Sequence, residues 1–254
     1  MHSLLTRRTI RRYTDQPVDD TLLNRLFHEA ARTQTMGNLQ LYSVVVTRSA
    51  EQKALLAPAH FNQPMVTQAP VVLTICADFN RTTRWAECRK ASPGYDNLLS
   101  FLNASIDALL YTQTLCNLFD EEGLGYCYLG TTVYQPQRII DVLRLPRLVM
   151  PVATLTVGWP HPDELKAPLT DRLTTDAFVH QETYRDYAPA DIDRLYAYKE
   201  QLEENRNFVA VNHKETLAQV FTDIRYTRSD NEALSAHLLD TLKHQGFLKV
   251  KSEE

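Results

Sequence analysis

The sequence predicts an α+β fold, in which helices cover a central sheet. Its 254 residues are 44% hydrophobic, enough for one large domain or two small ones with a substantial core. The strand-like segments are few, and the helical segments between them do not follow a regular βαβ alternation. Gly123-Leu124-Gly125 lacks the third glycine of a dinucleotide fingerprint and follows a helical pattern, so a doubly wound dinucleotide fold is disfavoured.

Two helices and two strands are predicted in the first 77 residues. Asp19 is a plausible cap for the first helix, because apolar residues recur after it at three- and four-residue spacing. The polar, glycine-bearing residues 34–40 and the segment 58–64 interrupt this pattern and predict loops. In order, the elements are a helix over 19–32, a strand over 42–47, a short helix over 50–56 and an apolar strand over 70–77.

A long apolar helix is predicted at the centre of the chain. Residues 95–122 leave little of the helix circumference polar, which is typical of a helix buried in a domain or at a subunit interface. Gly123 and Gly125 end it, because a left-handed cap favours glycine. The preceding residues 79–95 predict an irregular segment, either an exposed loop or a mobile lid that carries cations and Trp85.

The remainder of the chain predicts two further strands, an extended arm and four further helices. Residues 160–187 are rich in proline, threonine and polar side chains, which is typical of an arm rather than of a core element. The other elements are strands over 126–129 and 149–158, a helix over 135–143, and helices over 191–204, 213–224 and 230–245, with Gly246 capping the last.

Composition excludes several classes of protein. A formal net charge of −4 argues against a general nucleic-acid binder, and no apolar run approaches the roughly 18 residues that cross a bilayer. The N-terminus lacks the apolar region of a secretory signal. The four cysteines are scattered without metal-ligand spacing, and Cys76, Cys116 and Cys127 are expected to be buried. We therefore expect a cytoplasmic protein with neither a nucleic-acid nor a membrane partner.

A cationic segment near the N-terminus stands out against this acidic background. Guanidinium groups are always charged and match the oxygens of a phosphate, while threonine hydroxyls add neutral donors. If the segment is extended, Arg7, Thr9 and Arg11 point the same way. A solvated basic patch and a mitochondrial presequence are the alternatives. The segment reads Arg7-Arg8-Thr9-Ile10-Arg11-Arg12-Tyr13-Thr14.

Four segments in order resemble the flavin-dependent nitroreductase family, in particular its larger NADPH-nitroreductase and flavin-reductase branch. Each segment alone is weak evidence, but four segments in the family's order and spacing are strong evidence. The match covers most of the chain. They are residues 7–17, Gly37-Asn38-Leu39-Gln40 before a strand, Gly123-Leu124-Gly125-Tyr126-Cys127-Tyr128-Leu129-Gly130, and Gly158-Trp159-Pro160 leading to Leu165-Lys166.

The resemblance implies a nitroreductase-like central mixed sheet and a homodimer that binds FMN at the subunit interface. NADPH or NADH would give hydride to flavin N5, and a second substrate would then be reduced in a ping-pong cycle. No side chain would be catalytic, because the cofactor carries the chemistry. Gly130 matches the position whose backbone amide approaches N5. The implied cofactor-binding residues are Arg7, Arg8, Thr9, Arg11, Thr35, Asn38, Gln63, Tyr128, Leu129, Gly130, Thr131, Lys166 and Arg172.

Several details depart from the family pattern or stay open. Pro168 stands where the branch usually has an arginine, and Arg172 is a candidate substitute. Val209 falls near the arginine that selects NADPH, so the preference between NADPH and NADH is open, with Arg206, His213 or Lys214 as possible replacements. Gly130 could also be a simple strand-ending turn. The resemblance places an FMN-binding core over 1–160, completed as one domain and dimer by the arm and helices of 161–254.

The acceptor also stays open, with nitroaromatics, quinones and free flavin as candidates. A flavin-dependent dehalogenase or a flavin-processing enzyme of the same fold is one alternative. A non-catalytic flavin-binding module is another. The pairing of the Gly130 region with two cationic clusters, one early and one after Pro160, argues against such a module.

Overall fold

The computed structural model describes residues 3–248, and their centre is a four-stranded sheet of order β1-β2-β4-β3. Each neighbouring pair of these strands is antiparallel. The α+β class is confirmed, but within the described residues the sheet is antiparallel and not mixed. The strands are β1 (Tyr42–Thr47), β2 (Val71–Asp78), β3 (Gly125–Leu129) and β4 (Val149–Gly158).

Eleven α-helices accompany the sheet in the described residues. Several predicted ends are confirmed, because Asp19 accepts two backbone N–H bonds at the start of α2 and Gly123 adopts φ 75° at the end of α6. The helices are α1 (Ser3–Thr6), α2 (Asp20–Ala30), α3 (Ala50–Leu56), α4 (Pro64–Gln68), α5 (Asn80–Cys88), α6 (Leu98–Glu122), α7 (Pro136–Leu143), α8 (Pro189–Gln201), α9 (Glu203–Val211), α10 (Leu217–Val220) and α11 (Arg228–His244).

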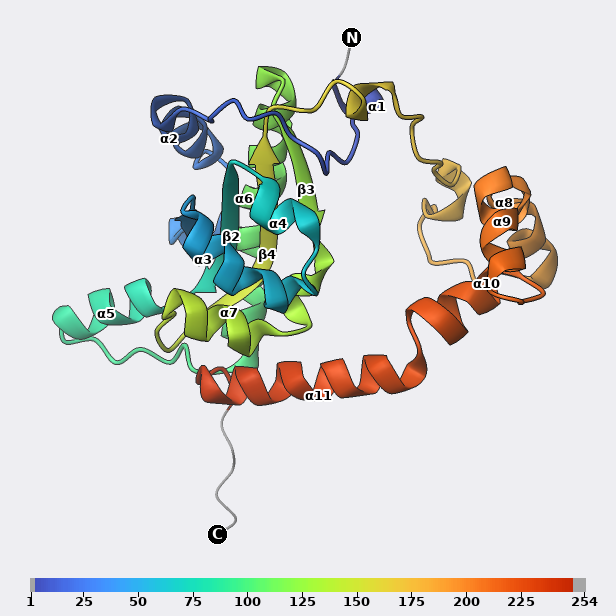
Figure 1. Cartoon of the computed structure of the whole chain (residues 1–254). Helices are drawn as coiled ribbons and strands as arrows, with labels where there is room; N and C mark the ends of the chain where they lie inside the picture. Colours follow the sequence, from blue (N-terminus) through green and yellow to red (C-terminus); the bar gives the residue numbers. More distant parts are fainter. Residues whose placement is uncertain (1–2, 249–254) are drawn as a thin grey trace. The chain divides into compact units, whose positions relative to one another are not determined.

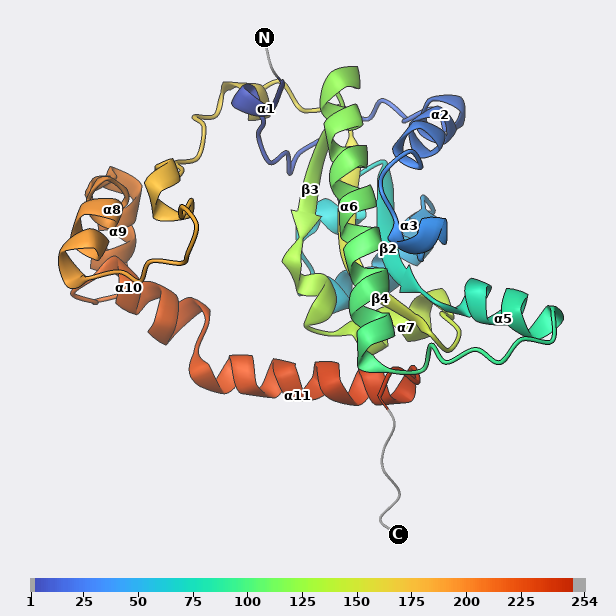
Figure 2. The same ribbon diagram turned by 180° about the vertical axis from the view of Figure 1, so that it is seen from behind.

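The two faces of the sheet pack against different helices. Helix α6 crosses one face (Figure 2), whereas α3, α4 and α7 lie on the other (Figure 1). Strand β2 is buried along its whole length, because its alternate side chains serve the two layers. Leu73 and Ile75 pack in the α6 layer, and Val72 packs with α3 and α4. The ends of the central strands are therefore held rigidly from both sides.

Residues 79–95, predicted to be irregular, contain the helix α5. Its first turn is fixed by Asp78, whose carboxylate accepts the N–H of Arg81. The buried positions of α5 are Thr82 and Ala86, one turn apart. These small or polar residues give no apolar periodicity, so the pattern in the sequence was too weak to indicate a helix.

Three other helices were also missed: the single turn α1, and the helices α4 and α9. The segment 58–64 was predicted as a loop, yet it leads directly into α4, whose Pro64 occupies the first turn where a missing N–H is harmless. Helix α9 begins at Glu203, immediately after α8, and buries only Asn205. Helix α4 buries only two side chains, Met65 and Val66, and α9 buries no apolar one, so neither shows a repeating apolar pattern. Short helices of this kind depend on tertiary contacts that the sequence alone does not display.

The described residues group into two compact units. One contains the residues up to Ala167 together with those from Leu234 onward, and the other is Pro168–Ala233. The sheet, α6, the N-terminal cationic segment and Lys166 all belong to the first unit. Within residues 3–248, no helix combines the length and apolar character required to span a membrane. Cys76, Cys116 and Cys127 are buried as predicted, and Cys88 is exposed.

Candidate functional site

The two cationic segments, distant in sequence, lie side by side in the structure. Tyr13 forms an isolated antiparallel bridge with Pro160, and the N–H of His161 donates to the carbonyl of Arg12 at 3.0 Å. Further along, Arg8 Nε donates to the carbonyl of Ala167 at 2.9 Å. The chain from Arg8 to Tyr13 therefore runs antiparallel to residues 160–167. This pairing brings Lys166 next to the N-terminal arginines.

A carboxylate holds these segments together. Glu164 accepts the backbone N–H of Arg11 at 2.9 Å and Arg12 Nε at 2.8 Å. Although burial alone would raise it, the pKa of Glu164 is lowered overall by these donors and by the charge of Arg12. Asp163 lies 3.4 Å from Lys166 Nζ and 3.8 Å from Arg12 Nη1. Sequence reasoning missed both acids, although Asp163 and Glu164 stand within three residues of Lys166.

Arg7 and Arg11 lie near different groups and not in one row. Arg7 borders a small cavity of about 130 Å³ with Asp120 and Gly125, at the end of α6. Burial raises the pKa of Asp120, and the hydrogen bond from Tyr126 and the charge of Arg7 oppose this effect. Arg11 instead lies beside Cys127, where burial raises the pKa of the thiol and Arg11 opposes the rise. Arg8 already donates to two carbonyls, of Thr6 and Ala167.

The N-terminal segment is fixed against β3 by close packing. Ile10 is 3% exposed and donates its N–H to the carbonyl of Tyr126 at 2.9 Å. A Cβ added to Gly125 would lie 2.7 Å from Ile10 Cγ2, so glycine is required for this approach. Because Ile10 points inward, its neighbours Thr9 and Arg11 are left on the outer side of the segment.

Gly130 lies at the end of β3 and presents an open backbone face. Gly130 is exposed, and a Cβ added to it would meet no atom within 4 Å. The side chain of Leu129 before it is buried, whereas that of Tyr128 is 45% exposed. Gly130 does not have a positive φ, so this glycine is not required by backbone conformation. The arrangement leaves room for a flat ligand against the chain.

Gln63 belongs to a segment that packs beside Gly130. Its N–H donates to the carbonyl of His60 at 3.1 Å, and it precedes the first turn of α4. The imidazole of His60 lies against the next residue after Gly130, with Nδ1 2.9 Å from Thr131 Oγ1. Phe61 and Tyr134 also meet edge to face across these segments. The structure therefore brings the predicted residues Gln63, Gly130 and Thr131 into one neighbourhood.

Thr35 and Asn38 occupy a separate loop against α6. Gly37, Asn38 and Gln40 all have φ near 55°, so the loop is tightly turned. Asp107, only 1% exposed, accepts the N–H of Met36 at 2.9 Å and that of Leu41 at 3.2 Å. None of the hydrogen bonds among residues 3–248 joins Thr35 or Asn38 to the other predicted site residues. Sequence reasoning did not single out Asp107.

The predicted cations beyond residue 167 belong to the second unit. Arg172 Nη1 donates to Thr170 and to the carbonyl of Asp171, which are its neighbours in sequence. Lys214, considered for recognition of NADPH, forms a 2.9 Å ion pair with Asp223. The roles proposed for Arg172 and Lys214 remain predictions.

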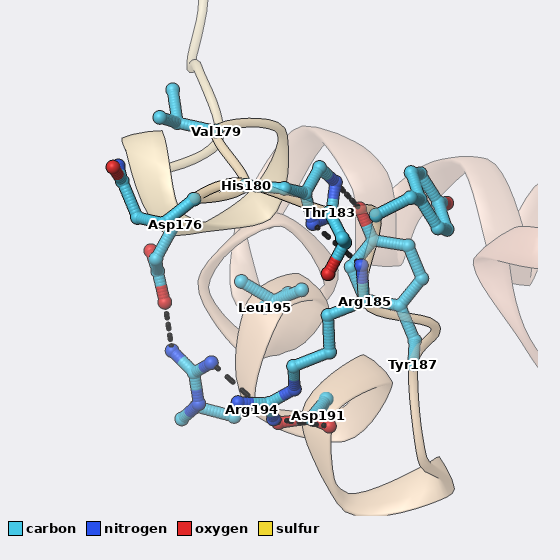
Figure 3. A pocket seen from close by; sticks show the side chains of 11 residues that line it. Asp176, Val179, His180, Thr183, Arg185, Tyr187, Asp191, Arg194 and Leu195 are labelled. Atoms are coloured by element: carbon cyan, nitrogen blue, oxygen red, sulfur yellow. Dashed lines mark hydrogen bonds and ion pairs between the residues drawn. The ribbon is translucent and has the colours of Figure 1, made fainter.

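The second unit also contains a cavity of about 660 Å³ that sequence reasoning did not anticipate (Figure 3). Its aromatic wall includes His180 and Tyr184, whose ring centroids are 4.3 Å apart. Its charged groups are paired with one another, since Arg185 contacts Asp191 at 3.2 Å and Arg194 contacts Asp176 at 2.6 Å. With its charges satisfied internally, the cavity reflects the packing of the arm on α8.

Comparisons with known proteins agree on one family. A family model described as the nitroreductase family matches residues 4–159. The chain is 31% identical to an FMN reductase [NAD(P)H] of Bacillus subtilis over 253 residues, covering 96% of each protein. It is also 31% identical to an oxygen-insensitive NADPH nitroreductase of Salmonella typhimurium, covering 78% of each. A crystal structure from Bacteroides fragilis, of a protein provisionally named an oxidoreductase, superposes with TM-score 0.95 at 56% identity, covering 98% of this chain and 100% of that one.

Proposed function

Because this chain belongs to the nitroreductase family, we propose that it reduces nitroaromatics, quinones or free flavin in a ping-pong cycle through bound FMN. The general activity follows from the family and its relatives: the protein is an NAD(P)H-dependent flavin oxidoreductase that uses FMN, with NADPH or NADH as the electron donor. What the proposal adds is the class of acceptor, the order of the two half-reactions and the residues that hold the cofactor.

The observation that supports the proposal most strongly is the open backbone at Gly130, next to Gln63 and Thr131. A planar ring can approach the backbone closely where no side chain projects, and apart from its chain neighbours no atom lies within 4 Å of a Cβ placed on Gly130. The paired cationic segments supply the second requirement, a place for the phosphate dianion. Arg11 and Lys166 are exposed there, and an anion would compete with Asp163 for the Lys166 ammonium group.

The residues of this chain would position the cofactor without taking part covalently. When bound, FMN supplies the hydride chemistry, accepting from the reduced nicotinamide and giving to the second substrate. The N-terminal segment and Lys166 would hold the phosphate end. The Gly130 amide would donate a hydrogen bond to the ring, and a preorganised dipole of this kind stabilises charge that develops there. Leu129 and the layer beneath it would keep water from the inner face.

An absorbance spectrum of the purified protein tests the proposal. We expect flavin bands that bleach when NADPH or NADH is added under anaerobic conditions, and that return when a nitroaromatic or quinone follows. Bands that persist with both donors would instead indicate a flavin-binding module. Initial rates measured against both substrates would give parallel double-reciprocal lines for a ping-pong cycle, and intersecting lines would exclude it.

Gly130→Val is expected to slow flavin reduction by at least tenfold, about 1.4 kcal/mol in barrier, while some FMN stays bound. The added side chain would contact no other part of the chain within 4 Å of its Cβ, and the φ of residue 130 is not positive, so folding should be preserved. The effect would therefore come from displacement of the ring. Stopped-flow reduction by NADPH measures it, with Gly94→Val as a control because Gly94 also has nothing within 4 Å. A rate within twofold of the parent would show that Gly130 is only a turn.

We also propose that the protein is an obligate homodimer, paired through α6. Six large aliphatic side chains of this helix are between 42% and 67% exposed in the single chain, a patch that monomeric proteins rarely present. A second copy of the same helix would bury them around a twofold axis, the symmetry that soluble homo-oligomers adopt most often. The exposed side chains are Leu98, Leu99, Leu102, Ile106, Leu109 and Leu110.

Light scattering at micromolar concentration is expected to give twice the chain mass. Ile106→Glu places a charge in the patch, so we expect it to yield aggregates or monomers that have lost FMN. Glu121→Lys, at an exposed position of the same helix, should leave the dimer intact. A folded monomer that retains FMN at this concentration would contradict the proposed assembly.

A further inference from the structure

A buried histidine next to the proposed flavin site has no part in the proposed redox chemistry. His60 is 0% exposed and ends the short helical turn Ala57–His60. Its Nδ1 lies 2.9 Å from Thr131 Oγ1, while Nε2 is buried and has no hydrogen-bond partner among the described residues. Burial lowers the pKa of His60 to about 4, so the ring is neutral at neutral pH.

His60 connects two segments that both carry predicted flavin-ring residues. Its carbonyl accepts the N–H of Gln63, and its side chain contacts Thr131, the residue after Gly130. The turn at Gly130 does not depend on this contact for its anchorage. Thr132 is fully buried, and its hydroxyl lies 2.8 Å from the carbonyl of Leu129 and 3.0 Å from Thr154 Oγ1. The His60 contact therefore acts on the side chain of Thr131 and not on the path of the backbone.

The two tautomers of a neutral His60 give Thr131 opposite roles. With hydrogen on Nε2, a buried N–H would remain without a partner, and orphaned N–H groups are rarer in proteins than under-used acceptors. With hydrogen on Nδ1, the ring donates to Thr131 Oγ1, and only a bare lone pair is left at Nε2. Thr131 then accepts from His60, and its own hydroxyl hydrogen is free to donate elsewhere.

We infer that His60 is a positioning residue, which holds the Thr131 hydroxyl as a hydrogen-bond donor for a polar edge of the ring bound at Gly130. That this ring belongs to a flavin rests on the proposed function. The half-buried Thr131 has His60 as the one hydrogen-bond partner of its hydroxyl in the described chain, so the freed hydrogen has no competing acceptor there. Thr131 thus adds a side-chain donor beside the Gly130 amide.

The tautomer is tested directly on the wild-type protein. Selective ¹⁵N labelling of the eight histidines gives ring-nitrogen shifts that distinguish Nδ1–H from Nε2–H, and His60→Asn assigns the signal by its loss. We expect Nδ1–H, with a shift that moves in Thr131→Val. A wild-type His60 that carries its hydrogen on Nε2 overturns the inference, whether or not FMN binds.

Substitutions test the role of the hydroxyl. Asparagine places an amide where Nδ1 lies, whereas glutamine places it near Nε2, so His60→Asn should preserve FMN affinity and flavin midpoint potential. His60→Gln and Thr131→Val should each weaken FMN binding by about two- to tenfold and shift the potential alike, as loss of one hydrogen bond implies. Their double variant should be no worse than either single one. The inference would be overturned if His60→Asn and His60→Gln had equal FMN affinity and midpoint potential. Additive losses of FMN affinity in the double variant would also overturn it.

These outcomes separate the inference from the function on which it rests. If the wild-type protein binds no FMN, the proposed function fails, and with it the ligand for Thr131, while the tautomer measurement still decides the His60–Thr131 contact. If FMN binds and is reduced but the potential is the same in all four variants, the proposed function stands and the positioning role of His60 is wrong.

Discussion

Asp107→Ala is expected to lower the free energy of unfolding by about 2–4 kcal/mol. The substitution leaves two backbone N–H groups without an acceptor, that of Leu41, which is buried, and that of Met36, which is part-buried. An unpaired buried N–H costs about 1–3 kcal/mol, and a part-buried one costs less because water reaches it. The backbone hydrogen bonds within this loop use other donors, such as the N–H groups of Leu39 and Tyr42, so none of them replaces the carboxylate as the acceptor for Met36 and Leu41. Urea denaturation at fixed protein concentration measures the change, since dimer formation would make stability depend on concentration.

Two control variants isolate the cause. Asp107→Asn keeps one acceptor oxygen and should lose about half as much stability. Glu121→Ala removes an exposed carboxylate from the same helix, and its effect should stay within about 0.5 kcal/mol. If Asp107→Ala costs no more than Glu121→Ala, the loop is held by something other than this carboxylate. FMN affinity should also fall in Asp107→Ala if Thr35 and Asn38 contact the cofactor.

Arg11→Ala is expected to weaken FMN binding by about ten- to a hundredfold. A charge-assisted hydrogen bond to phosphate contributes about 1.5–3 kcal/mol, which corresponds to that range of affinity. The segment should keep its position in this variant, because the backbone N–H of residue 11 donates to Glu164 and alanine keeps that bond. The exposed guanidinium is removed, and with it the contact to Cys127.

Riboflavin, which lacks the phosphate, distinguishes a phosphate contact from a structural one. Titration of apoprotein should show that riboflavin binds the parent and Arg11→Ala almost equally. Arg84→Ala removes the same charge from an exposed position of α5 and should change FMN affinity little. Equal losses for FMN and riboflavin in Arg11→Ala would mean that Arg11 supports the fold and does not hold the phosphate.

The sequence by itself determined the elements whose side chains repeat with a clear period. All four strands were predicted within a few residues, because short runs rich in β-branched or aromatic residues and bounded by turn residues favour strands over helices. The long helix α6 and its glycine cap were equally clear. The ordered motifs around residues 7–17 and Gly130 also indicated the family, which the family model confirms.

Tertiary structure decided the features that the spacing of hydrophobic residues in the sequence does not indicate. Helix α5 buries only Thr82 and Ala86, a polar and a small side chain, which give no apolar repeat in the sequence. Strand direction is likewise invisible in a run of apolar residues, so the expected mixed sheet proved antiparallel in the described chain.

The polar groups that arrange the candidate site were decided in the same way. Asp107, Glu164 and His60 act on partners 66, 153 and 71 residues away. Aspartate, glutamate and histidine are common in any sequence. A buried carboxylate or imidazole acquires its role only from the hydrogen-bond partner that folding places against it. Hydrophobic periodicity is a local property of the chain, whereas satisfying a buried polar group requires atoms from elsewhere in the fold.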